Sequence, residues 1–170
     1  MGQYFTSVFG TKMDELKLNT ILLVEDNEDD IILIRRLLDK TGIKINNILI
    51  ARDIDDAIQI MKSDKNIDIV LLDLNLPSSK KIDTIKNVIH IPAFSGVIIV
   101  LTSIGDTNTQ IEALKFTISD YLVKSDTDSL RLKRAIISAL SRREIISKIK
   151  EANRQANQLA EIVKNINEYL

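Results

Sequence analysis

Short apolar segments rich in β-branched residues and leucine alternate along the chain with segments of helical periodicity. The apolar segments have the length and composition of strands buried on both faces, and the periodic segments each have one apolar face. Right-handed crossover helices return successive strands to the same direction, so this pattern predicts a parallel sheet. We expect strands at residues 20–25, 46–51, 67–73, 97–102 and 120–123, and helices at about 29–40, 54–62, 82–89 and 108–116.

Such crossovers place helices on both faces of the sheet, which predicts a three-layer α/β sandwich built from five strand and helix pairs. Sheets of this kind bind ligands beyond the carboxyl ends of their strands. We therefore expect any functional site to be formed by the residues that follow the strands.

The end of the chain has a different pattern. Residues 128–170 contain neither glycine nor proline, which predicts one helix of roughly 40 residues and about 60 Å. Its distal part has a heptad seam, which predicts a parallel two-stranded coiled coil and a homodimer. The alternative is a helix that folds back on its own domain. The a positions are Ile149, Ala156, Val163 and Leu170, and the d positions are Ile145, Ala152, Leu159 and Ile166.

Composition restricts the function. The 170 residues include 23 Lys and Arg against 24 Asp and Glu, a net charge of -1 that disfavours direct nucleic-acid binding. No cysteine is present, so disulfides and zinc-thiolate sites are excluded. No apolar run approaches the length of a membrane span, and we expect a cytoplasmic protein without membrane contact. The expected organisation is a leader at 1–18, one domain at 19–140 and a coiled-coil helix at 141–170.

Polar residues end or follow four of the predicted strands. Glu25 ends the first predicted strand and Asp26 follows it, Asp73 ends the third, Thr102 ends the fourth, and Lys124 follows the fifth. Carboxylates at one sheet edge repel one another unless a cation lies among them, and oxygen-only ligands suit Mg²⁺. A hydroxyl and an ammonium opposite the metal would complement the other oxygens of a phosphoryl group. This set of residues predicts phosphoryl transfer onto a carboxylate.

Four motifs together resemble the receiver domain of two-component response regulators, over about residues 19–140. The combination in this order is specific, although each motif alone is weak. The resemblance implies a flavodoxin-like fold and a sensor histidine kinase or phosphotransfer protein as partner. The motifs are ILLVEDN at 21–27, IVLLDLNLP at 69–77, VLTS at 100–103 and DYLVK at 120–124.

The resemblance also implies a role for each matched residue. Asp73 would be the phosphoacceptor, and the domain would be a signalling domain that assists only its own phosphorylation and dephosphorylation. The implied Mg²⁺ ligands are Glu25, Asp26, an Asp73 oxygen and the backbone carbonyl of Asn75; Lys124 and Thr102 would bind the phosphoryl oxygens, and Tyr121 would be the switch aromatic.

The chain also departs from the family pattern. Ser125 replaces the usual proline after Lys124, so a cis peptide is not expected there. The residues at 117–118 and 81 also differ from the usual small residues. Asp29 and Asp30 are interpreted as helix-start residues that favour the helix dipole, not as ligands.

Other functions fit less well. A phosphatase of the aspartyl-phosphate type would need an acid two residues after Asp73, where Asn75 stands, and no glycine-rich nucleotide motif is present. The remaining alternative is a degenerate receiver that acts as a non-phosphorylated dimerisation scaffold. The complete set of pocket residues argues against that alternative.

Overall fold

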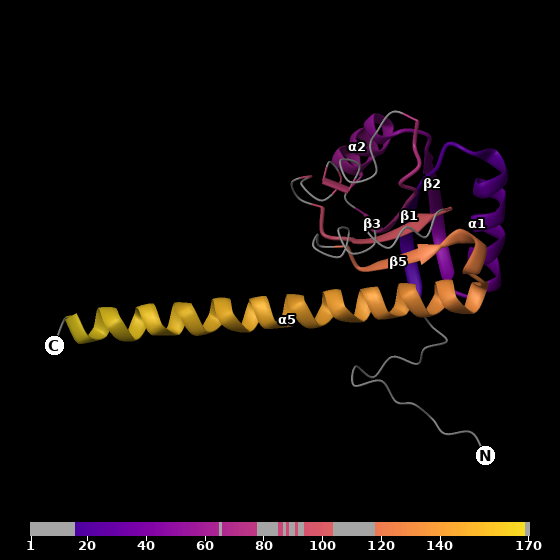
Figure 1. The fold of residues 1–170 in the computed structure, drawn as a ribbon. Helices are drawn as coiled ribbons and strands as arrows, with labels where there is room; N and C mark the ends of the chain where they lie inside the picture. The colour runs from indigo at the N-terminus through magenta and orange to yellow at the C-terminus, as the bar shows by residue number, and fades with distance from the viewer. Residues whose placement is uncertain are drawn as a thin grey trace, which may run out of the picture.

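The computed structural model describes residues 16–64, 66–77, 85, 86, 88, 91, 94–103 and 118–168. Five described strands form one parallel sheet in the order β2-β1-β3-β4-β5, seen at the centre of the domain in Figure 1. The predicted parallel five-stranded sheet is therefore confirmed. Its strands are β1 (Lys17–Val24), β2 (Lys44–Ala51), β3 (Ile67–Leu72), β4 (Val97–Thr102) and β5 (Asp120–Val123).

Helices cover both faces of this sheet. Helices α1 (Glu28–Lys40) and the first part of α5 (Ser129–Glu168) pack on one face, and α2 (Ile54–Ser63) packs on the other. Each face has its own buried cluster, because alternate side chains of the central strands point to opposite sides. Ile69 and Leu71 belong to one cluster, and Val70 and Leu72 to the other. The layers agree with the predicted α/β sandwich.

Local sequence explains where the helices begin and end. The Asn27 side chain accepts hydrogen bonds from the first turn of α1, and Asp53 does the same for α2. Gly42, at φ 72°, adopts the left-handed conformation just after α1, which glycine takes without strain. These caps fix α1 and α2 immediately after β1 and β2, so both helices start at the carboxyl edge of the sheet.

Helix α5 consists of two parts with different surroundings. Its first part buries Leu132 and Ile136 against the sheet. Arg142 then donates to the carbonyl of Ser119, and Arg143 donates to the carbonyl of Ser95 at 3.4 Å. From position 144 to 165 every side chain is exposed, and Figure 1 shows this part of the helix continuing beyond the sheet. The alternative of a helix folded back on its domain is therefore wrong for the described residues.

Strand and helix boundaries differ little from prediction. β1 begins at Lys17, not at residue 20, and β2 begins at Lys44, not at residue 46; these early residues pair with each other. The strand predicted for 67–73 ends at Leu72. The helix expected at 108–116 lies outside the described residues, as do most of the leader and most of the helix expected at 82–89. Within the described part of the chain, no helix combines the length and apolar composition that crossing a membrane requires.

Candidate functional site

The site lies at the carboxyl edge of the sheet, where β1 and β3 are neighbours. Glu25 and Asp73 are the residues that follow these strands, and the sheet hydrogen bonding continues through them. The Glu25 N–H donates to the carbonyl of Ala51 at 2.9 Å, and the Asp73 N–H donates to the carbonyl of Val24 at 3.0 Å. The backbones of both acidic residues are thus held by the sheet, and their side chains are 1% and 4% exposed.

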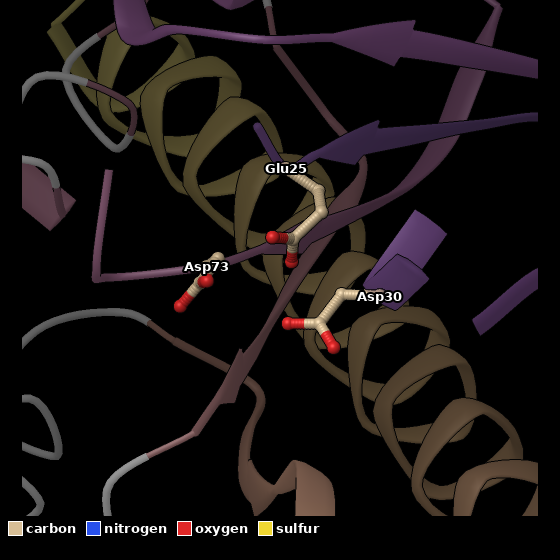
Figure 2. A group of neighbouring side chains, drawn as sticks. All are labelled: Glu25, Asp30 and Asp73. Carbon is tan, nitrogen blue, oxygen red and sulfur yellow. The ribbon is translucent and has the colours of Figure 1, made fainter. Parts of the chain in front are cut away.

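A third carboxylate reaches the same point from α1. One oxygen each of Glu25, Asp30 and Asp73 lies within 4.8 Å of the others. Figure 2 shows the three side chains gathering at the sheet edge from three different segments of the chain. Asp30 is the most solvent-exposed of the three, with 30% of its side chain exposed.

Lys124 joins these carboxylates. It follows β5 in a short 3₁₀ turn (Lys124–Asp126), and its side chain is only 6% exposed. Its Nζ donates to Glu25 Oε2 at 2.5 Å, to Asp30 Oδ2 at 2.6 Å and to Asp73 Oδ2 at 2.8 Å. The described residues contain no cis peptide, as expected for Lys124 followed by Ser125. One buried ammonium therefore donates to three carboxylates.

The electrostatics of this group are strongly perturbed. Burial raises the pKa of Glu25 to about 7, because removal from water disfavours its charged form and the nearby Asp73 adds repulsion; the contacts with Lys124 lower it only partly. Burial alone would lower the pKa of Lys124, but its hydrogen bonds to Asp30, Asp73 and Glu25 outweigh that effect and raise the pKa. The three carboxyl groups thus favour the charged form of Lys124.

Hydrogen bonds of Asn75 connect Thr102 to the site. The Asn75 backbone N–H donates to Asp73 Oδ1 at 3.0 Å, and its side-chain Nδ2 donates to Thr102 Oγ1 at 3.1 Å. Thr102 is 1% exposed. One oxygen of Asp73 is therefore held by Lys124 and the other by the backbone N–H of Asn75, whose side chain also binds the buried hydroxyl of Thr102.

The structure brings together most of the predicted residues. Asp26 is half-buried beside the site, but its carboxylate does not belong to the group of three. Tyr121 is half-buried on β5 and packs against the α2-side core. Asp30 was interpreted only as a helix-start residue; it does lie in the first turn of α1, yet it also pairs with Lys124. Nothing in the sequence distinguishes it from Glu28 and Asp29, the other acidic residues of that turn.

The donor set fits a hard divalent ion. All three clustered side chains offer carboxylate oxygens, and neither histidine nor cysteine belongs to the group. Mg²⁺ prefers such oxygen ligands and usually keeps several waters. Buried carboxylates in excess over their ammonium partner would gain from a second cation. The residues present therefore fit a Mg²⁺ ion at this edge of the sheet.

Comparison with known proteins agrees with this geometry. The family model for the response regulator receiver domain matches residues 21–137. The transcriptional regulatory protein CpxR of Klebsiella pneumoniae subsp. pneumoniae (strain HS11286) is 32% identical over 122 residues, which cover 71% of this chain and 50% of the relative. The chain thus spans about half the length of this curated relative.

Solved structures extend the comparison to the fold. A response regulator receiver domain protein from Clostridium thermocellum is 26% identical with a TM-score of 0.64, and the match covers 76% of this chain and 99% of that one. The Mn²⁺-bound form of response regulator Rcp1 is 25% identical with a TM-score of 0.55, covering 72% and 89%. With the family model matched over more than half of its length, the chain belongs to the response regulator receiver family.

Proposed function

We infer that this chain is a phosphoacceptor receiver of a two-component phosphorelay, with Asp73 as the residue that becomes phosphorylated. The observation that carries the inference is the placement of Asp73. It is 4% exposed at the end of a central strand, and its two oxygens meet Lys124 and the Asn75 N–H. A carboxylate held this way keeps a fixed orientation toward an incoming phosphoryl group.

The transfer is a displacement at phosphorus. An Asp73 oxygen forms the new O–P bond, the P–N bond of a partner phosphohistidine breaks, and the imidazole leaves with the bonding electron pair and takes up a proton. Lys124 stabilises charge on the transferred oxygens because its ammonium already lies 2.8 Å from Asp73. A sensor histidine kinase or a phosphotransfer protein supplies the phosphoryl group.

The metal ion belongs to this proposal. Glu25, Asp26, an Asp73 oxygen and the backbone carbonyl of Asn75 are the residues that would hold it. When bound, Mg²⁺ neutralises charge on the phosphoryl oxygens. Of these residues, Glu25 and Asp73 belong to the cluster of carboxylates within 4.8 Å, whose negative charge supports a cation at this place. The Mn²⁺-bound form of the related Rcp1 is in line with it.

Phosphorylation would act on the rest of the domain through Thr102 and Tyr121. Thr102 now accepts from Asn75, and a phosphoryl group on Asp73 would offer its hydroxyl a stronger, charged acceptor. In the proposed switch, the hydroxyl moves toward that group and Tyr121 turns inward. The face that the helix expected at 108–116 would form with β5 and α5 would change with them, as a two-state equilibrium biased by a new contact.

The distal part of α5 would carry a homodimer. The seam residues Ile149, Leu159 and Val163 are 54%, 63% and 57% exposed. Their burial would therefore require a second helix. A parallel coiled coil would bury them at a and d positions. Since α5 also packs on the sheet next to β5, a change at the switch face would alter the packing of this dimer.

One experiment separates this function from the degenerate scaffold. The protein is incubated with Mg²⁺ and acetyl phosphate, and its intact mass is compared with that of an Asp73→Asn variant. We expect a phosphoryl mass gain that requires both Mg²⁺ and Asp73. No gain, together with no binding of beryllofluoride, would contradict the phosphoacceptor function and favour the scaffold.

A further inference from the structure

Asp30 differs from the other acidic residues in the first turn of α1. Glu28 and Asp29 are exposed, whereas Asp30 is half-buried and accepts a 2.6 Å hydrogen bond from Lys124. The helix end does not need this carboxylate, because the Asn27 side chain already accepts from the backbone N–H groups of Asp29 and Asp30. The Asp30 side chain therefore contributes to the pocket more than to the helix end.

A divalent ion between Glu25 and Asp73 would change the contacts of Lys124. The ammonium now donates to both carboxylates, at 2.5 Å and 2.8 Å, and thus occupies oxygens that an incoming ion would need. Two cations on the same oxygens repel each other strongly at this depth. Lys124 must then give up at least part of its contact with these two residues.

Asp30 offers Lys124 a partner that does not compete with the ion. It lies within the same hydrogen-bonding distance of Nζ, but on α1 and closer to solvent than Glu25 and Asp73. A buried ammonium without an acceptor is costly in free energy. The contact with Asp30 therefore lowers the cost when Lys124 gives up its contacts with Glu25 and Asp73. The negative charge of Asp30 also attracts a second cation to the pocket.

We propose that Asp30 is a positioning residue of the phosphorylation site, which holds the Lys124 ammonium when Glu25 and Asp73 take up Mg²⁺. This inference deepens the proposed function and rests on it. Removal of the Asp30 charge leaves Lys124 on Glu25 and Asp73 and takes a negative charge away from the site. Both effects weaken Mg²⁺ binding.

The test measures Mg²⁺ binding to the unphosphorylated full chain by calorimetry. Asp30→Asn should bind Mg²⁺ about tenfold more weakly than the unaltered protein, the size of effect typical for residues that support metal ligands. Asp29→Asn is the matched control, because it removes an equal charge from the same helical turn at an exposed position. It should bind within about twofold of the unaltered protein, since its charge lies outside the pocket. Asp30→Glu, which keeps the charge, should restore most of the affinity.

Each outcome bears on the proposal. Equal affinities for Asp30→Asn and Asp29→Asn would overturn the role of Asp30 and leave the proposed function intact. Equal losses of Mg²⁺ affinity in Asp30→Asn and Asp30→Glu would also overturn the role of Asp30, because its negative charge would then not be the cause. No Mg²⁺ binding by the unaltered protein would contradict the metal site itself, and the acetyl phosphate experiment reports separately on Asp73. Circular dichroism of the metal-free variants verifies that they are folded.

Discussion

The pocket at the sheet edge and the distal part of α5 both reverse the usual distribution of side chains. The pocket buries charge, with Glu25 and Asp73 at 1% and 4% exposure around Lys124. The distal helix exposes apolar residues, with Ile149 at 54% and Leu159 at 63%. Apolar residues normally provide the buried surface, and charged groups are seldom fully buried unless paired. The two regions thus differ in one respect: the buried charges of the pocket are paired with one another, whereas the apolar side chains of the distal helix are left exposed in the described part of the chain.

That difference has an energetic meaning. A buried ion pair contributes little net stability, because desolvation offsets most of its attraction. Exposed isoleucines and leucines on a single helix contribute nothing to burial until a partner covers them. Neither region is therefore explained by the stability of a single copy. Both would be explained by the binding that we propose, of a phosphoryl group and a cation at the pocket and of a second helix at the distal part of α5.

The largest effect is expected from removing the cation of the pocket. Lys124→Met leaves three carboxylates without their ammonium and should lower the free energy of unfolding by about 3–5 kcal/mol. Urea denaturation of the metal-free protein measures this loss. Lys150→Met, which removes the same charge from an exposed position on the distal helix, should change stability by less than about 0.5 kcal/mol. Equal losses of stability in Lys124→Met and Lys150→Met would refute the contrast between the pocket and the distal helix.

A second comparison uses two leucines on the same helix. Leu132 is fully buried against the sheet, and Leu132→Ala should cost about 2–5 kcal/mol of stability through lost burial and a cavity. Leu159→Ala should leave the stability of the receiver domain unchanged within about 0.5 kcal/mol, as for other exposed positions. Thermal unfolding at low protein concentration provides the measurement. A large loss for Leu159→Ala under those conditions would mean that the distal helix packs on its own domain.

The proposed dimer is tested by placing charged residues on the seam of the distal helix. Ile149→Asp together with Val163→Asp puts charges at two a positions and should convert the proposed dimer into a monomer, as measured by sedimentation at micromolar protein concentrations. Asn157→Asp together with Asn165→Asp adds the same charge off the seam and should leave the dimer intact. A monomeric unaltered protein would contradict the dimer, and dissociation by both pairs would mean that net charge, not the seam, is responsible.

The smallest effect concerns pH. The raised pKa of Glu25, about 7 in the folded protein, means that the folded state holds a proton that the unfolded state loses near pH 4.5. The stability that this proton contributes is fully present below pH 4.5 and is lost as pH rises through 7. Glu25→Gln should remove this decline, so the variant becomes more stable than the unaltered metal-free protein at pH 8 by on the order of 1 kcal/mol. If the stability of the two proteins changed with pH in the same way, the raised pKa would not belong to Glu25.

The sequence predicted most of this arrangement because strand ends are visible in the chain. Buried apolar runs that stop at Asp73 and Thr102 specify both the strands and the edge at which their polar neighbours meet. The start of β1 at Lys17 escaped prediction, since its first residues alternate exposed and buried and resemble a polar leader. The sequence could not place Asp30 in the pocket, because that depends on the angle at which α1 leaves the sheet.

Asp73 is the proposed site of an acyl phosphate, and the most direct test locates that group. The Mg²⁺-loaded protein is treated with acetyl phosphate, reduced with borohydride and digested, and the peptide that contains Asp73 is sequenced by mass spectrometry. We expect the carboxyl group at position 73 to be reduced only when both Mg²⁺ and acetyl phosphate are present. An unmodified Asp73, with a reduced carboxyl group elsewhere or none at all, would contradict the proposed site.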